Sequence, residues 1–230
     1  MSLFVIGDTH LSFGTDKPMD IFRGWENFEE KLKNNWLAVV KSDDTVVIPG
    51  DITWGMTMET ALPDFKFIDA LPGTKIIMKG NHDYWWPTKK KAETFFENNG
   101  IKTIKILNNN AYSAGSLALC GTRGWMADSS KPEDRKIVLR EAARLKMSID
   151  CAKSLGGEPI AFLHYPPMSG GKVCEEIVSE LIAGGVKRCY YGHLHGAAAS
   201  FAPGCEMFGI KFKLVSSDYL GFCPKLVEKF

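Results

Sequence analysis

The chain has 230 residues, of which 45% are hydrophobic and 24% are charged. This composition excludes a disordered chain, a collagen-like repeat and a disulfide-dense miniprotein, and the length fits one domain over residues 1–230. The 28 basic residues nearly balance the 27 acidic ones, so the net charge of +1 provides no global field for nucleic acid or a membrane surface. We therefore expect no membrane partner and no long nucleic acid, while the oligomeric state stays open.

The six cysteines form no C-x-x-C pair and lie mostly among apolar residues, a pattern typical of reduced, packed thiols. An apolar stretch over residues 3–6 follows Met1 without a basic segment or a cleavage site. No run approaches the roughly 18 apolar residues of a membrane span. We expect a cytoplasmic protein.

Short apolar runs rich in Val, Ile, Leu and Phe predict buried strands. In chain order these runs cover residues 3–6, 45–48, 75–78, 117–120, 160–163, 188–191, 212–216 and 225–230. Apolar residues at helical spacing predict helices over 25–36 and 138–152, and Pro87 and Pro132 stand where first-turn prolines belong. The order predicts an α/β fold with mixed sheets.

Three long stretches have no regular pattern, and irregular segments of that length are often functional. They cover residues 11–24, 122–131 and 197–209.

All five histidines lie just past the end of a predicted strand, beside other polar residues. They are His10, His82, His164, His193 and His195. A single histidine at a strand end is readily explained as a hydrogen-bonded structural residue, but five such placements together indicate metal ligands. The carboxyl ends of strands in α/β sheets are also where ligand sites gather.

Spacing suggests which of these side chains meet. In extended backbone, side chains at positions i and i+2 point to one side, so Asp8 would converge with His10, and His193 with His195. The candidate residues fall in five short clusters, and four of these begin with a glycine: Gly7, Gly50, Gly80 and Gly192. Glycine allows a tight turn and lets a metal or phosphate come close to the backbone.

The donor set narrows the metal. Carboxylate, imidazole and amide groups without thiolate suit Mn, Fe, Zn or Ni, with Mn the favoured ion for activity. The candidate ligands are Asp8, His10, Asp51, Asn81, His164, His193 and His195. Because this set exceeds what one ion takes, we expect two divalent ions bridged by one carboxylate.

Charge then indicates the substrate. Two divalent cations with Asp8, Asp51 and a bridging hydroxide leave a surplus of about +1, which suits an anionic phosphoryl group. A metal-bound hydroxide would attack phosphorus in line.

Two further residues are candidates for catalysis. His82 is followed by Asp83, which could orient its ring and make it the general acid that protonates the leaving oxygen; the alternative is an eighth metal ligand. Arg123, in a Gly-rich turn after the 117–120 strand, would clamp a phosphate oxygen or else form a surface ion pair.

Four tryptophans lie close to these motifs: Trp54, Trp85, Trp86 and Trp125. They form either an aromatic wall for a nucleoside or aryl group or the packing of the loops that hold the ligands, and the second reading is favoured.

The ordered set D-x-H, G-D, G-N-H-D, H and G-H-x-H, spanning residues 7–196, resembles the calcineurin-like metallophosphoesterase superfamily. The resemblance implies a four-layer αββα sandwich of two mixed sheets with a dinuclear site at one edge. It assigns one ion to Asp8, His10, Asp51 and His195, and the other to Asp51, Asn81, His164 and His193. It leaves His82 facing the phosphate. Protein serine/threonine phosphatases of this superfamily have an arginine directly after the aspartate of the Gly-Asp motif, and this chain has Ile52 there, which argues against a protein phosphatase.

We therefore expect a dinuclear-metal phosphohydrolase acting on a small phosphodiester or phosphomonoester. A catalytically weak metal-binding scaffold of this fold and a nuclease of the same superfamily are the alternatives. The natural substrate and the choice between diester and monoester are not fixed by the sequence.

Overall fold

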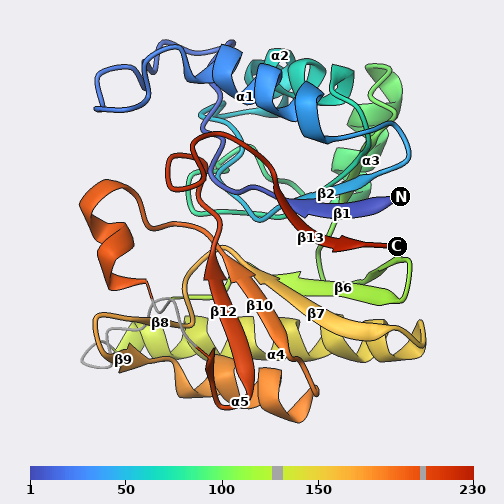
Figure 1. Ribbon diagram of the computed structural model, residues 1–230, viewed down its shortest axis with the longest axis vertical. Coiled ribbons are helices and arrows are strands. Elements are labelled where there is room, and N and C mark those ends of the chain that lie inside the picture. Colours follow the sequence, from blue (N-terminus) through green and yellow to red (C-terminus); the bar gives the residue numbers. More distant parts are fainter. Residues whose placement is uncertain (126–131, 203–205) are drawn as a thin grey trace.

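A computed structural model describes residues 1–125, 132–202 and 206–230 of the chain. It consists of two β-sheets that pack face to face, with helices on both outer sides (Figure 1). Among the described residues no helix is both long and apolar enough to cross a membrane.

The first sheet has five strands, parallel except for the antiparallel edge strand β13. In order across the sheet they are β13 (Lys225–Lys229), β1 (Ser2–Val5), β2 (Thr45–Ile48), β3 (Thr74–Ile77) and β4 (Ile104–Ile106). Its outer face is covered by α1 (Phe28–Val39), α2 (Met58–Ala70) and α3 (Lys89–Asn98).

The second sheet has six strands, of which the two at the edges are antiparallel to their neighbours. In order they are β11 (Glu206–Met207), β12 (Ile210–Leu214), β10 (Arg188–Tyr191), β7 (Glu158–Leu163), β6 (Leu117–Thr122) and β5 (Tyr112–Ala114). Its outer face carries α4 (Pro132–Ser154) and α5 (Glu175–Ala183). The remaining elements are the hairpin β8 (Met168–Ser169) and β9 (Lys172–Val173), and the 3₁₀ helix η1 (Gly196–Phe201).

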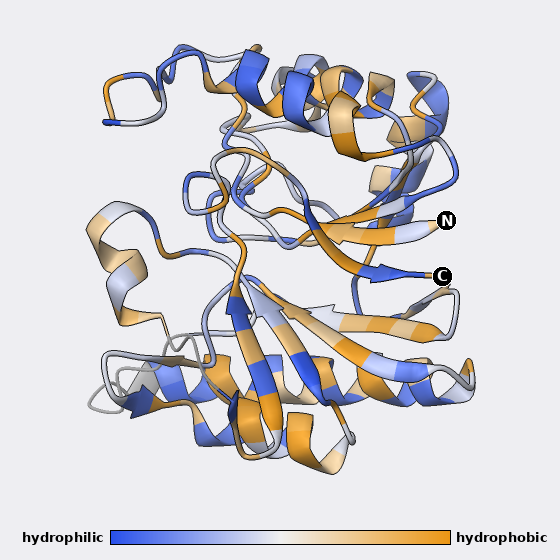
Figure 2. Ribbon diagram, in the orientation of Figure 1, coloured by the Kyte–Doolittle hydropathy of each residue, from blue (hydrophilic) through white to orange (hydrophobic). Residues whose placement is uncertain are grey.

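Alternation along the strands divides the core into three layers. On β1, Leu3 and Val5 face the second sheet, whereas Phe4 packs under the helices of the first. On β7, Phe162 belongs to the layer between the sheets and Ala161 to the layer under α4 and α5. Because both faces of the central strands are buried, their sequences are continuous apolar runs. In Figure 2, β12 alternates between hydrophobic and hydrophilic colours, as its exposed lysines require. The predicted αββα sandwich is confirmed.

All eight predicted strands are present within a few residues of their expected bounds, and so are the helices predicted over 25–36 and 138–152, although α4 begins six residues before the expected start. The sequence reading did not identify β4, β5, β8, β9, β11 or α2. Pro87 is not in a first helical turn, because Thr88 is the N-cap of α3, whereas α4 does begin at Pro132.

Residues 11–24 are irregular, as predicted. The 197–209 stretch is not wholly so, since it contains most of η1 and all of β11. Residues 126–131 of the 122–131 stretch lie outside the described residues, as do residues 203–205, which include Cys205. The five described cysteines form no disulfide with one another, which agrees with the expected free thiols.

Candidate metal centre

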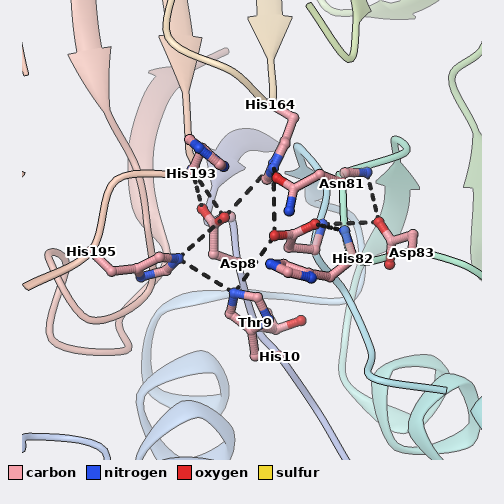
Figure 3. Close-up of polar contacts among 12 residues, drawn as sticks. Asp8, Thr9, His10, Asn81, His82, Asp83, His164, His193 and His195 are labelled. Carbon is pink, nitrogen blue, oxygen red and sulfur yellow. Dashed lines mark hydrogen bonds and ion pairs between the residues drawn. The ribbon is translucent and has the colours of Figure 1, made fainter. Parts of the chain in front are cut away.

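The candidate ligands follow the carboxyl ends of five strands, which meet at one edge of the two sheets. Asp8 and His10 follow β1, Asp51 follows β2, and Asn81 follows β3, all in the first sheet. The second sheet contributes His164 after β7, and His193 and His195 after β10. Figure 3 shows the side chains of Asp8, His10, Asn81, His164, His193 and His195 pointing toward one another.

Two groups of potential ligands form within this cluster. The first contains Asp8, His10 and His195, whose donor atoms lie within 4.8 Å of one another. His195 Nε2 lies 3.4 Å from His10 Nε2 and 3.5 Å from Asp8 Oδ1. Two imidazole nitrogens facing each other beside a carboxylate form an arrangement that a shared cation would satisfy.

The second group contains Asp51, His164 and His193. His164 Nε2 lies 3.5 Å from Asp51 Oδ2 and 2.7 Å from Asn81 Oδ1, so the asparagine also reaches this group. The same Asp51 oxygen lies 3.7 Å from His10 Nε2. Asp51 therefore stands between the two groups, where a bridging carboxylate would be placed.

The backbone at this cluster is unusual. Asp8, His10, Asp51 and His193 have φ values of 56°, 44°, 51° and 71°, in the left-handed region that residues other than glycine seldom adopt. Such conformations cost free energy and persist at functional sites where surrounding contacts hold them. Here backbone hydrogen bonds join the loops, from Asp8 N–H to the Gly50 carbonyl at 3.0 Å and from Gly192 N–H to the His164 carbonyl at 3.1 Å.

We expected His193 and His195, two residues apart, to converge on one point, and this expectation is wrong. His193 and His195 belong to different groups. Asp8 and His10 do share a group, but through two left-handed residues rather than an extended strand. Two of the glycines allow close approach, but of a ligand side chain rather than of a metal or phosphate. A Cβ on Gly80 would overlap the Asp51 carboxylate, and a Cβ on Gly192 would overlap the Asp8 carboxylate.

Burial governs the electrostatics of the cluster. Desolvation, with smaller contributions from neighbouring histidines, lowers the pKa of His10 to about 3 and of His193 to about 4. Desolvation and then the Asp8 charge raise the pKa of Asp51 to about 8. The neutral imidazole is the form that ligates metals, and two neighbouring buried carboxylates favour a cation between them. The donors thus fit two divalent ions.

A carboxylate that the sequence reading missed supports this arrangement. Asp218 accepts hydrogen bonds from His195 Nδ1–H and from the Gly196 N–H, each at 2.9 Å. Burial lowers the pKa of His195, but the hydrogen bonds to Asp218 and Asp8 outweigh it and raise that pKa to about 10. Asp218 fixes the orientation of the ring, as carboxylates behind metal-ligating histidines do. The only signal in the sequence was its position after a strand.

Asp83 does not orient His82. Its carboxylate is fully buried and accepts hydrogen bonds from the backbone N–H groups of Gly80, Asp51 and Ile52 at 2.7–3.0 Å, and from Trp85 Nε1. Asp83 is thus committed to tying the loop after β3 to the loop after β2. The expected contact between Asp83 and the His82 ring is therefore wrong, because the Asp83 oxygens accept hydrogen bonds from backbone N–H groups instead.

His82 belongs to neither ligand group. Its backbone N–H donates to Asp51 at 2.8 Å, while the buried Nδ1 of its ring has no hydrogen-bond partner among the described residues. The ring lies against the Trp54 indole, with 4.4 Å between centroids. Burial, and secondarily His164, lower the pKa of His82.

A cavity of about 440 Å³ opens beside the first ligand group. Its lining includes His10, His82, His195, Met19, Phe22, Trp25 and Trp54. Of the four tryptophans singled out in the sequence, Trp54 faces this cavity, whereas Trp85 is buried against Phe65. Trp25, which the helical spacing placed in the core, is a wall of the cavity that the sequence reading missed.

Arg123 lines a second cavity of about 340 Å³ together with Lys79, Trp86 and Arg144. Its Nη2 lies 3.8 Å from Glu141, which is fully buried, so this ion pair is not the surface pair considered from the sequence. The guanidinium lies over the Trp125 ring at 5.0 Å, and the Arg123 carbonyl accepts the N–H groups of His164 and Tyr165. The backbone of Arg123 therefore supports the loop that carries a candidate ligand.

Comparison with solved structures identifies similar folds. A protein of unknown function from Aquifex aeolicus superposes with a TM-score of 0.55 at 18% identity, covering 98% of this chain and 95% of that one. A phosphopantetheinyl hydrolase from Mycobacterium tuberculosis gives a TM-score of 0.55 at 11% identity with the same coverage. At these identities the likeness concerns the fold alone. No curated protein matches the sequence.

The family model of calcineurin-like phosphoesterases matches residues 1–197, which include all seven candidate ligands and His82. The match covers most of the chain and agrees with the two ligand groups at the sheet edge. The chain belongs to the calcineurin-like phosphoesterase family.

Proposed function

We propose that the protein is a phosphoesterase that hydrolyses a small phosphodiester or phosphomonoester, with Mn as the activating ion. The observation that carries the proposal is the pair of ligand groups on either side of Asp51. One group would hold the first ion with Asp8, His10, His195 and Asp51, and the other would hold the second with Asp51, Asn81, His164 and His193. Two divalent ions held there would supply Lewis acidity and lower the pKa of a bound water.

The chain's own residues would handle the proton on the leaving group. As the bond from phosphorus to the leaving oxygen breaks and the bond to the oxygen of water forms, the protonated His82 imidazolium would give a ring proton to the leaving oxygen and become the neutral imidazole, while the proton lost by the water would pass to solvent. The lowered pKa of His82 makes its imidazolium a stronger acid. His82 suits this role because it borders the cavity without belonging to either ligand group. Arg123 would bind a phosphate oxygen that reaches the second cavity.

Elemental analysis and hydrolysis assays test the proposal. Protein purified without chelator and supplied with Mn should bind two ions per chain and hydrolyse aryl phosphoesters. Chelation or Asp51→Asn should remove the activity. Full activity of the metal-stripped protein would refute the proposal.

The acid role of His82 makes a separate prediction about leaving groups. His82→Ala should slow hydrolysis of phenyl esters by roughly 10²–10⁴-fold, because phenol leaves poorly without a proton. Esters of 2,4-dinitrophenol should lose far less, since that leaving group needs no proton. Equal losses for both esters, or a loss of bound metal, would assign His82 to metal binding instead.

A further inference from the structure

The 440 Å³ cavity beside the metal centre combines two kinds of wall. Its polar lining includes His10, His82 and His195. Met19, Phe22, Trp25 and Trp54 supply the apolar part of the lining. A ligand in this cavity that reaches the histidines must therefore also contact apolar side chains, and the volume is sufficient for a small organic group.

The deeper apolar walls are held in place by contacts of their own. Trp25 is only 3% exposed and packs edge-on against Phe28 and Phe222, with centroids about 5 Å apart. Trp54 stacks on His10 at 5.0 Å and donates its Nε1–H to Met19 Sδ at 3.3 Å. Such a wall is preorganised, so a ligand need not order these indoles on binding.

The mouth of the cavity presents an apolar side chain to solvent. Phe22 lines the cavity yet is 53% exposed, although a ring of this size is favoured in buried positions. It lies in the irregular 11–24 segment that was expected to be functional. A ligand covering Phe22 would remove apolar area from water and gain affinity from it.

The polar residues of the lining indicate which ligand groups the cavity does not favour. Arg23 and Asp218 are its charged residues apart from the histidines, and Asp218 is already committed to His195 and Gly196. The cations near the apolar wall are Arg23 in the lining and Lys17, whose Nζ lies 5.0 Å from the centroid of the Trp54 ring, against four apolar side chains in the lining itself. The lining therefore favours an uncharged apolar group over a sugar or a further phosphate.

We propose that this cavity binds the leaving group of the substrate, and that this group is uncharged, apolar and about the size of a bicyclic aromatic ring. The inference rests on the proposed phosphoesterase function. His82, the proposed donor to the leaving oxygen, borders the cavity, so the group attached to that oxygen lies between Trp54 and Phe22. The substrate is thus a phosphoester of a bulky apolar alcohol.

The test uses esters whose leaving groups have similar acidity but different apolar area. On the Mn-loaded protein, 2-naphthyl phosphate, or its methyl diester, should be hydrolysed with a kcat/KM about tenfold above that of the phenyl compound. Calorimetric titration with two phosphonates that cannot be hydrolysed gives a binding readout. The protein should bind 2-naphthylmethylphosphonate about tenfold more tightly than benzylphosphonate.

Phe22 and Phe13 form a matched pair of variants, because both lie in the 11–24 segment and are 53% and 50% exposed, but only Phe22 lines the cavity. Phe22→Ala should reduce both naphthyl preferences about threefold or more, and Phe13→Ala should leave them unchanged. Equal treatment of the two ring sizes by the unmodified protein, or equal effects of the two variants, would overturn the inference.

The two proposals fail in different ways. If the esters are not hydrolysed but the naphthyl phosphonate is still preferred and Phe22→Ala abolishes that preference, the phosphoesterase function falls and the apolar cavity stands. If both esters are hydrolysed equally well and neither variant matters, the function stands and the leaving-group assignment falls. Absence of both hydrolysis and phosphonate binding refutes both.

Discussion

Two carboxylates outside the ligand groups position the candidate metal ligands. Asp83 fixes two loops through buried hydrogen bonds, and Asp218 fixes the ring of His195. Neither residue is a member of a ligand group, yet both set the positions of residues that are. Changing partners of this kind typically costs about 10- to 100-fold in metal affinity or activity.

Asp218→Asn should weaken binding of the ion held by the first group by about 10- to 100-fold, because the carboxylate that orients His195 is lost. Titration with Mn, followed by calorimetry, measures this. Asp150→Asn is the matched control, since Asp150 is an exposed carboxylate paired with Lys146 on α4. Unchanged affinity in Asp218→Asn would show that the hydrogen bond does not support the metal site.

The candidate ligands were easier to pick out in the sequence than the residues that hold them in place, for a physical reason. A histidine or aspartate immediately after an apolar run is visible locally, as with His164 after β7. The role of Asp83 depends on backbone amides of another loop, which carry no side-chain signature. Asp218 meets His195 across a turn and η1, so their contact follows only from the fold.

At the level of single elements, α2 was missed because Pro63 lies inside it. Proline removes one backbone hydrogen bond, and the surrounding packing of Phe65 and Ile68 compensates. The short edge strands were missed because β4 and β5 are three residues long, with an exposed residue in the middle of each. The central strands were predictable because burial on both faces makes them continuously apolar.

The carboxyl end of α2 has an unusual partner. No basic residue lies in its last turn, and instead the buried Lys75 of β3 donates from Nζ to the carbonyls of Leu71 at 2.6 Å and Gly73 at 2.9 Å. Burial lowers the pKa of Lys75 to about 8. The Lys75 ammonium group thus donates to carbonyls that have no hydrogen-bond partner within the helix, and its burial disfavours its charged form.

This lysine predicts a pH dependence of stability. Between about pH 8 and 10.5 the unfolded chain holds a proton that the folded chain has released, so the free energy of unfolding gains a contribution that rises with pH. Relative to Lys75→Met, the unmodified protein should gain about 1–3 kcal/mol across that window. Urea unfolding of both proteins at pH 8 and pH 10 measures the difference. A difference that does not change with pH would contradict the prediction.

For the whole molecule, the candidate centre joins the two sheets. Each ligand group combines residues from both, since Asp8 and Asp51 follow strands of the first sheet while His195 and His193 follow β10 of the second. An ion in either group would therefore add a crosslink between halves that already share an apolar layer and contacts such as the Arg188–Glu228 ion pair. Metal binding and folding stability should be linked.

Adding Mn should raise the midpoint of thermal unfolding, by an amount equivalent to about 2.7 kcal/mol when the free ion is at 100 times its dissociation constant. Calorimetry of the metal-free and Mn-loaded protein measures the shift. Asp51→Asn, which removes the carboxylate between the groups, should largely abolish it. An equal shift in that variant would mean that the ion binds elsewhere.

The pairing of β13 with β1 also bears on how the chain is made. On one side β1 pairs with β13, a strand that begins only at residue 225, and Phe230 N–H donates to the Met1 carbonyl at 3.2 Å. Until that segment has been synthesised, the nascent polypeptide exposes a strand edge that can pair with other chains. Translation that stalls late should therefore yield aggregation-prone fragments that need chaperone protection.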